Sequence, residues 1–130
     1  MHADIYANLR LAAWRDALRV LAIQSVSLVI MSAATTLGWG VQAGLGVLIG
    51  AGIGLFANAY LAVVLLGRPL LQGRPADVML SWLIKVVLTL SLLWVAMRAH
   101  IVPPLSLMVG LFGVMVAHWS AGMFWLRGFR

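Results

Sequence analysis

Long apolar stretches separated by short polar segments dominate the chain. A helix needs about 20 apolar residues to cross the hydrocarbon core of a bilayer. Four stretches come close to or exceed this length, at residues 20–37, 41–66, 78–97 and 101–126. Within them the one charged residue is Lys85. The pattern predicts an all-α, polytopic membrane protein with four transmembrane helices, as a single integral membrane domain over residues 1–130.

The connections between the apolar stretches are short. They cover residues 38–40, 67–77 and 98–100. Short links place consecutive helices side by side and antiparallel. The sequence therefore predicts two helical hairpins joined by one polar loop.

The segment before the first apolar stretch has a different pattern. Ile5, Leu9 and Ala13 fall near helical spacing, whereas Arg10 and Arg15 lie on other faces. A helix with one apolar and one basic face is typical of a segment that lies in the membrane interface. We expect a short N-terminal interfacial helix.

Composition excludes several classes of protein. Hydrophobic residues make up 64% of the 130 residues, charged residues 9%, and the mean hydropathy is +1.06, whereas a soluble domain carries roughly 25% charged residues. There is no Cys, which excludes disulfides and thiolate chemistry. Asp4, Asp16 and Asp77 are the only carboxylates and lie outside the spans. We expect no enzyme activity, no cofactor and no metal site.

Basic residues predict the orientation. Residues 1–19, 67–77 and 127–130 hold seven of the Lys and Arg residues, and the segments on the opposite side hold Arg98 alone. Lys and Arg accumulate on the cytoplasmic side of membrane proteins. Both termini and the middle loop are therefore predicted to be cytoplasmic. The same residues would meet lipid headgroups rather than nucleic acid.

Polar residues within the spans cluster at one depth. Asn58, Lys85 and His118 each lie seven or eight residues from the cytoplasmic end of a span, and Gln24 lies slightly nearer the cytoplasm. Buried polar groups in a membrane need one another as hydrogen-bond partners. This layer either holds the hairpins together or forms a partner or ion site. Lys85 either extends toward the cytoplasmic headgroups or contacts a carboxylate or helix carbonyls.

A glycine ridge lies on the second predicted helix. Gly46, Gly50, Gly54 and Asn58 repeat every four residues, and Gly52 lies off the ridge. Small residues at this spacing let two helices approach closely in lipid. The ridge packs either within this chain or against a glycine-rich helix of another protein.

Together these features resemble the ATP synthase protein I family. The resemblance covers most of residues 15–126: four short spans, a glycine-rich second helix through Gly54, then Asn58, a basic loop and Lys85 in the third helix. It implies a small accessory protein of the bacterial inner membrane, linked to assembly of the F-type ATP synthase rotor ring from c subunits. A role in magnesium uptake has also been suggested for the family. The positions carried over are the ridge Gly46–Gly54, Asn58 and Lys85.

The favoured hypothesis is therefore an assembly factor whose glycine ridge docks on c-subunit helices, and whose Lys85 transiently meets the c subunit's carboxylate. The alternative is a small cation (magnesium) transporter or channel. A magnesium path would use oxygen ligands, and Lys85 opposes a cation. A rotor subunit or a small multidrug exporter would need a carboxylate within a span, and the sequence has none. The expected partners are membrane lipid and the c subunit, with a homo-oligomer left open.

Overall fold

Long helices account for almost all of the described structure. The computed structural model describes residues 2–67 and 75–127. Each helix is long and apolar enough to cross a membrane, which confirms the predicted all-α membrane fold. Residues 68–74 and 128–130, which carry part of the predicted cytoplasmic charge, lie outside the described residues. The helices are α1 (His2–Trp39), α2 (Val41–Gly67), α3 (Pro75–Arg98) and α4 (Pro104–Arg127).

The N-terminal segment is part of α1. The expectation of a separate short helix was wrong, because one continuous helix of 38 residues runs from His2 to Trp39. Between His2 and Leu37 the sequence has no Pro and no Gly, the two residues that most readily stop a helix. At 1.5 Å per residue, α1 is about 57 Å long, nearly twice the thickness of the hydrocarbon core. Its first turns therefore extend beyond the membrane, with Arg10 and Arg15 exposed.

Two tight turns connect the helices at the same end of the molecule. Gly40 separates α1 from α2 with a φ of 91°, a left-handed conformation that glycine adopts without strain. At the second turn, His100 has a φ of 51°. There α4 begins at Pro104, three residues later than the predicted start at Ile101. Proline suits the first turn of a helix, where its missing N–H leaves no bond unmade.

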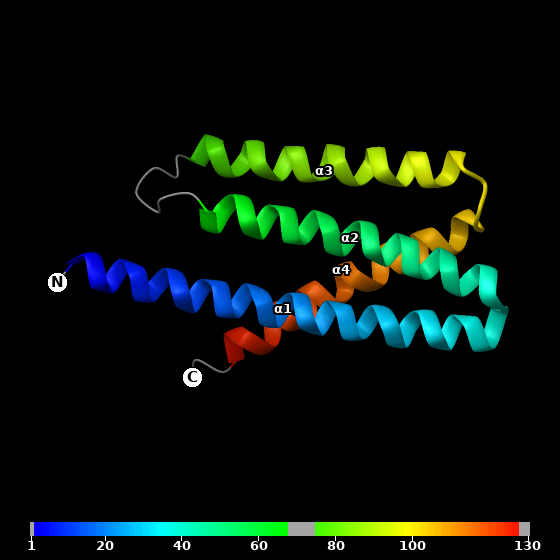
Figure 1. Ribbon diagram of the computed structural model, residues 1–130, viewed down its shortest axis with the longest axis horizontal. Helices are drawn as coiled ribbons and strands as arrows, with labels where there is room; N and C mark the ends of the chain where they lie inside the picture. Colours follow the sequence, from blue (N-terminus) through cyan, green and yellow to red (C-terminus); the bar gives the residue numbers. More distant parts are fainter. Residues whose placement is uncertain (1, 68–74, 128–130) are drawn as a thin grey trace.

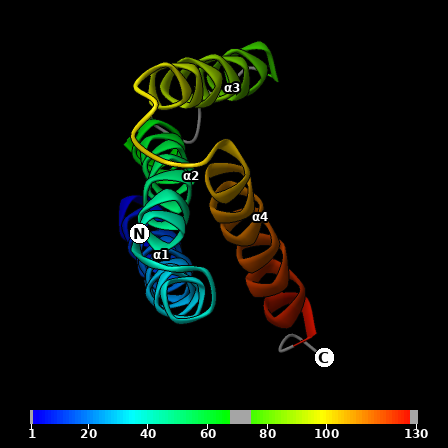
Figure 2. The same cartoon turned by 90° about the vertical axis from the view of Figure 1, so that its right-hand side faces the viewer.

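The helices form two layers (Figure 1). α1, α2 and α3 lie side by side, and α4 crosses one face of this layer. The end view places α2 at the centre, in contact with all three other helices (Figure 2). α4 packs mainly on α2 and α1, so α3 and α4 diverge from the turn that joins them. The short link makes α3 and α4 neighbours in the sequence. In space, however, both helices pack on α2 more than on each other.

The core lies between α2 and α4 and uses small side chains. Val47, Ala51 and Ala57 of α2 are fully buried, as are Leu107 and Val114 of α4. Most large apolar side chains point outward instead, which suits a surface covered by lipid. A second cluster joins the end of α3 to the start of α4 through Leu93, Val102 and Leu107.

Candidate functional site

The glycine ridge of α2 faces α4 of the same chain. A Cβ atom at Gly50 would collide with the backbone carbonyl of Leu107, and one at Gly46 would collide with the Ser106 hydroxyl. At Gly54 the nearest α4 side-chain atom would be 3.2 Å away. The ridge therefore packs within the chain, one of the two alternatives left open by the sequence. A partner could use the same ridge only after α4 had left it.

Sequence reasoning missed the matching glycine on α4. A Cβ atom at Gly110 would collide with the backbone of Val47 and Ala51, so the two helices touch backbone to backbone. The signal was present, because Ser106 and Gly110 form a small-xxx-small pair of their own. Gly52, predicted to lie off the ridge, has open space around it.

Three residues of the predicted polar layer meet in one hydrogen-bonded network. The Asn58 amide Nδ2 donates to Gln24 Oε1 at 3.4 Å, and Gln24 Nε2 donates to His118 Nδ1 at 2.7 Å. These residues come from α2, α1 and α4, and Gln24 is fully buried. The network therefore satisfies a buried amide and joins the three helices that form the tightest part of the fold.

The network also orients the imidazole of His118. An amide nitrogen can only donate, so Nδ1 must accept and the ring proton of the neutral imidazole lies on Nε2. His118 as a whole is an exposed residue. The Asn58–Gln24–His118 chain thus leaves the Nε2–H of His118 as a donor for another group.

A small cavity lies beside this network. Its volume is about 140 Å³, enough for a few water molecules. Gln24, Asn58 and His118 supply hydrogen-bonding groups to its lining, and the remaining lining residues are apolar: Ala17, Val20, Leu21 and Ala62.

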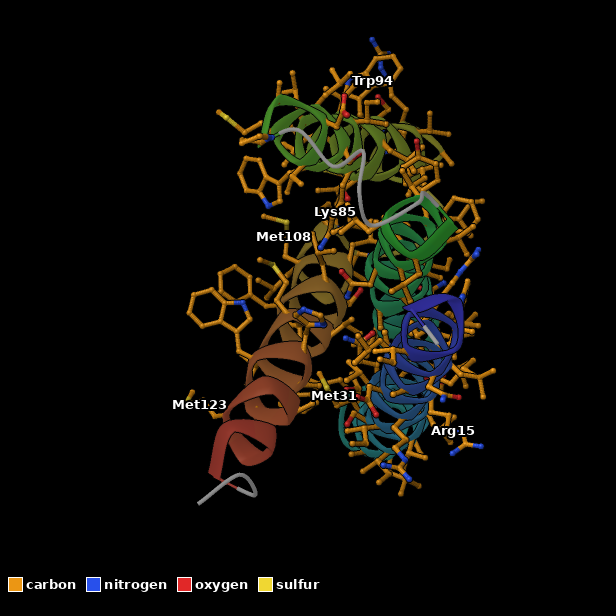
Figure 3. The ribbon with its side chains drawn as sticks, turned by 90° about the vertical axis from the view of Figure 1, so that its left-hand side faces the viewer. Arg15, Met31, Lys85, Trp94, Met108 and Met123 are labelled. Atoms are coloured by element: carbon orange, nitrogen blue, oxygen red, sulfur yellow. The ribbon has the colours of Figure 1, made fainter. Side chains whose placement is uncertain are left out.

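Lys85 approaches the network from α3. It lies ten residues after Pro75, near the middle of α3, and seven residues, or about 10 Å, inside the span predicted to begin at Val78. Its side chain is half-buried and extends from α3 toward the side of α2 on which α4 lies (Figure 3). Hydrogen bonds therefore join Gln24, Asn58 and His118, and Lys85 of α3 is directed toward the side of α2 on which the helix of His118 lies.

Comparison with known families decides the family of this chain. The family model described as ATP synthase I chain matches residues 19–112, well over half of the sequence. The chain belongs to the ATP synthase I chain family. The match includes Gln24, Asn58, Lys85 and the glycine ridge, and it ends within α4 before His118. Comparisons with curated proteins and with solved structures give no match.

In this member of the ATP synthase I chain family the polar layer favours a hydrogen-bond acceptor over a cation. Lys85 offers an ammonium group and His118 offers Nε2–H, and both are donors. Within the described part of the chain, no three His, Asp or Glu side chains come together in a way that could hold a metal ion. The site therefore suits a carboxylate or carbonyl oxygen.

Proposed function

We propose that this member of the ATP synthase I chain family assists assembly of the rotor ring by holding c-subunit helices in the bacterial inner membrane. The observation that carries the proposal is the half-buried Lys85 near the middle of α3, in a chain whose own carboxylates lie outside the apolar stretches. A lysine in a span costs a few kcal/mol on insertion scales unless it finds a partner. A carboxylate in a c-subunit helix is a partner of the opposite charge.

A transient contact is consistent with an accessory role. The pairing of Lys85 with a carboxylate is strong only while water is excluded, because the attraction between two charges grows as the dielectric constant falls. Release of the c subunit into a closed ring would end the contact. A magnesium path is the weaker alternative, because the ammonium of Lys85 lies in the polar layer and repels a cation.

Substitution of Lys85 tests this function. We expect the c subunit to co-purify with the wild-type protein in mild detergent, and its recovery to fall at least tenfold with Lys85→Met. The reason is that methionine keeps the length of the side chain and removes its charge, which leaves the partner's carboxylate unpaired. Lys85→Arg keeps the charge with a different geometry and would retain part of the recovery.

All variants are compared at matched expression, and the helix content and monodispersity of each are measured first. Undiminished recovery of the c subunit with Lys85→Met would contradict the proposal and leave Lys85 as a lysine that extends toward the headgroups.

The proposed orientation places both termini and the loop between α2 and α3 in the cytoplasm. It follows from the seven Lys and Arg residues assigned to that side. Because the chain has no native Cys, single-Cys variants label cleanly. We expect a membrane-impermeant maleimide to label Trp39→Cys, at the opposite end of α1, in intact cells, and to label Gln72→Cys only after the membrane is opened. Labelling of Gln72→Cys in intact cells would reverse the orientation.

A further inference from the structure

Two hydrogen-bond donors lie within apolar helices, Lys85 on α3 and His118 on α4. Lys85 lies ten residues from the start of α3 at Pro75, and His118 lies nine residues from the end of α4 at Arg127. The two positions therefore have similar depths. Figure 3 shows the Lys85 side chain extending from α3 toward the side of α2 on which α4, the helix of His118, lies.

His118 is held so that it can donate. Gln24 donates to Nδ1, and Gln24 is itself held by Asn58, so Nε2–H is the group left for a ligand. His118 is an exposed residue. It lies beyond the residues that match the family model.

The side of the molecule between α3 and α4 is open and apolar. Leu93 of α3 belongs to the cluster that touches α4, and Trp82 lies three helical turns earlier on the same side of α3, 60% exposed. Figure 3 shows Met108 on the side of α4 that faces α3. Met115 and Trp119 follow it at intervals of seven and eleven residues, and both are exposed. Because α3 and α4 diverge, these apolar side chains of the two helices border Lys85 and His118.

The matching acceptor must come from another molecule. Asp4, Asp16 and Asp77 lie outside the apolar stretches, and Asp77 is two helical turns before Lys85, about 12 Å along α3. Two donors bordered by apolar side chains inside the spans are complementary in charge to a carboxylate on an otherwise apolar helix. A lipid headgroup phosphate would lie about 10 Å or more from this depth.

We propose that Lys85 and His118 together form a carboxylate site between α3 and α4, and that its occupant is a membrane-spanning helix of a partner protein with one carboxylate at the same depth. This inference rests on the proposed function for the partner's identity, but its chemistry can be tested without the c subunit. Gln24 is a positioning residue, because it fixes which nitrogen of His118 can donate.

A designed helix provides the test. The protein is labelled with a donor dye at Trp39→Cys, far from the site, and placed in phosphatidylcholine vesicles with an apolar Leu/Ala helix that carries an acceptor dye. The helix has a single Glu or a single Gln at its centre. Energy transfer then measures binding. We expect the Glu helix to bind wild type at least tenfold more tightly than the Gln helix.

Variants of the protein then show which residues produce the tighter binding of the Glu helix. Lys85→Met and His118→Phe are each expected to reduce the preference for Glu at least fivefold, and Gln24→Leu to reduce it several-fold. His100→Asn is the matched control: it removes an exposed imidazole elsewhere, and asparagine tolerates the left-handed backbone there. Binding of the Gln helix, which uses apolar contacts, shows whether each variant is folded. If His118→Phe is unfolded, Gln24→Leu carries the test.

Cross-linking tests the location of the helix. We expect a Cys in the designed helix to form a disulfide with Met115→Cys, beside the site, and not with Val29→Cys, which is exposed on α1. Equal binding of the Glu and Gln helices to wild type would overturn the inference, and so would an undiminished preference in His118→Phe or cross-linking to position 29 alone.

The outcomes separate the two proposals. A Glu preference that depends on Lys85 and His118, together with no co-purification of the c subunit, would keep the carboxylate site and reject the proposed partner. Recovery of the c subunit that depends on Lys85 but not on His118 would keep the proposed function and reject the two-donor site.

Discussion

Replacement of Gly50 by Ala is expected to lower the stability of the protein by about 1–3 kcal/mol, the usual cost of an extra methyl group in a well-packed site. The added Cβ atom would collide with the backbone carbonyl of Leu107. A backbone cannot rotate away as a side chain can, so α2 and α4 would have to separate. Separation would weaken contacts along the whole crossing, since close packing supplies much of the attraction between helices in lipid.

Gly52→Ala is the matched control on the same helix. A Cβ atom at Gly52 meets nothing within 4 Å, and alanine favours a helix over glycine by up to about 1 kcal/mol. We therefore expect Gly52→Ala to be neutral or stabilising. The measurement is unfolding of the purified protein in mixed micelles of rising dodecyl sulfate content. Equal effects at the two positions would contradict a directional ridge.

The same pair of variants also separates the two roles of the ridge. If the ridge packs within the chain, Gly50→Ala lowers stability whether or not the c subunit is present. If a partner also uses the ridge after α4 has left it, Gly50→Ala would reduce recovery of the c subunit more than Gly110→Ala does, because Gly110→Ala disturbs the same helix crossing from α4 and leaves the ridge itself unchanged.

The four spans and the polar layer could be predicted from sequence for simple physical reasons. The length of an apolar run is set by the thickness of the bilayer, and depth along a helix follows from a rise of 1.5 Å per residue. Asn58, Gln24 and His118 could therefore be placed at similar depths, and the hydrogen bonds join them. Depth says nothing about direction around a helix, so the direction of Lys85 required the structure.

The packing of α4 could not be predicted from the short connections. Residues 98–100 indicate that α3 and α4 are consecutive and antiparallel, and this favours their contact. In lipid, however, no hydrophobic force selects one apolar neighbour over another, so close packing of small residues decides. Ser106 and Gly110 fit the glycine ridge of α2. The contact between α2 and α4 therefore prevails, and the side of α3 next to α4 stays open.

The second large effect is expected at Gly110, which lies on α4 where this helix crosses α2. A Cβ atom there would collide with the backbone of Val47 and Ala51, so Gly110→Ala is expected to cost about 1–3 kcal/mol. Gly113 is the matched control, three residues later on α4. Its added Cβ atom would meet the Sδ and Cε atoms at the tip of Met31. A methionine tip moves easily, and alanine favours a helix over glycine by up to about 1 kcal/mol, so we expect Gly113→Ala to be neutral or stabilising.

The double variant Gly50→Ala/Gly110→Ala tests whether the two glycines serve one contact. Once the first methyl group has forced α2 and α4 apart, the second has more room, so its added cost falls. We expect the double variant to lose less stability than the two single losses together, by about 0.5–3 kcal/mol, the range of coupling between residues in contact. Strict additivity in the dodecyl sulfate titration would mean that Gly50 and Gly110 act at independent sites, and the backbone crossing of α2 and α4 would then be wrong.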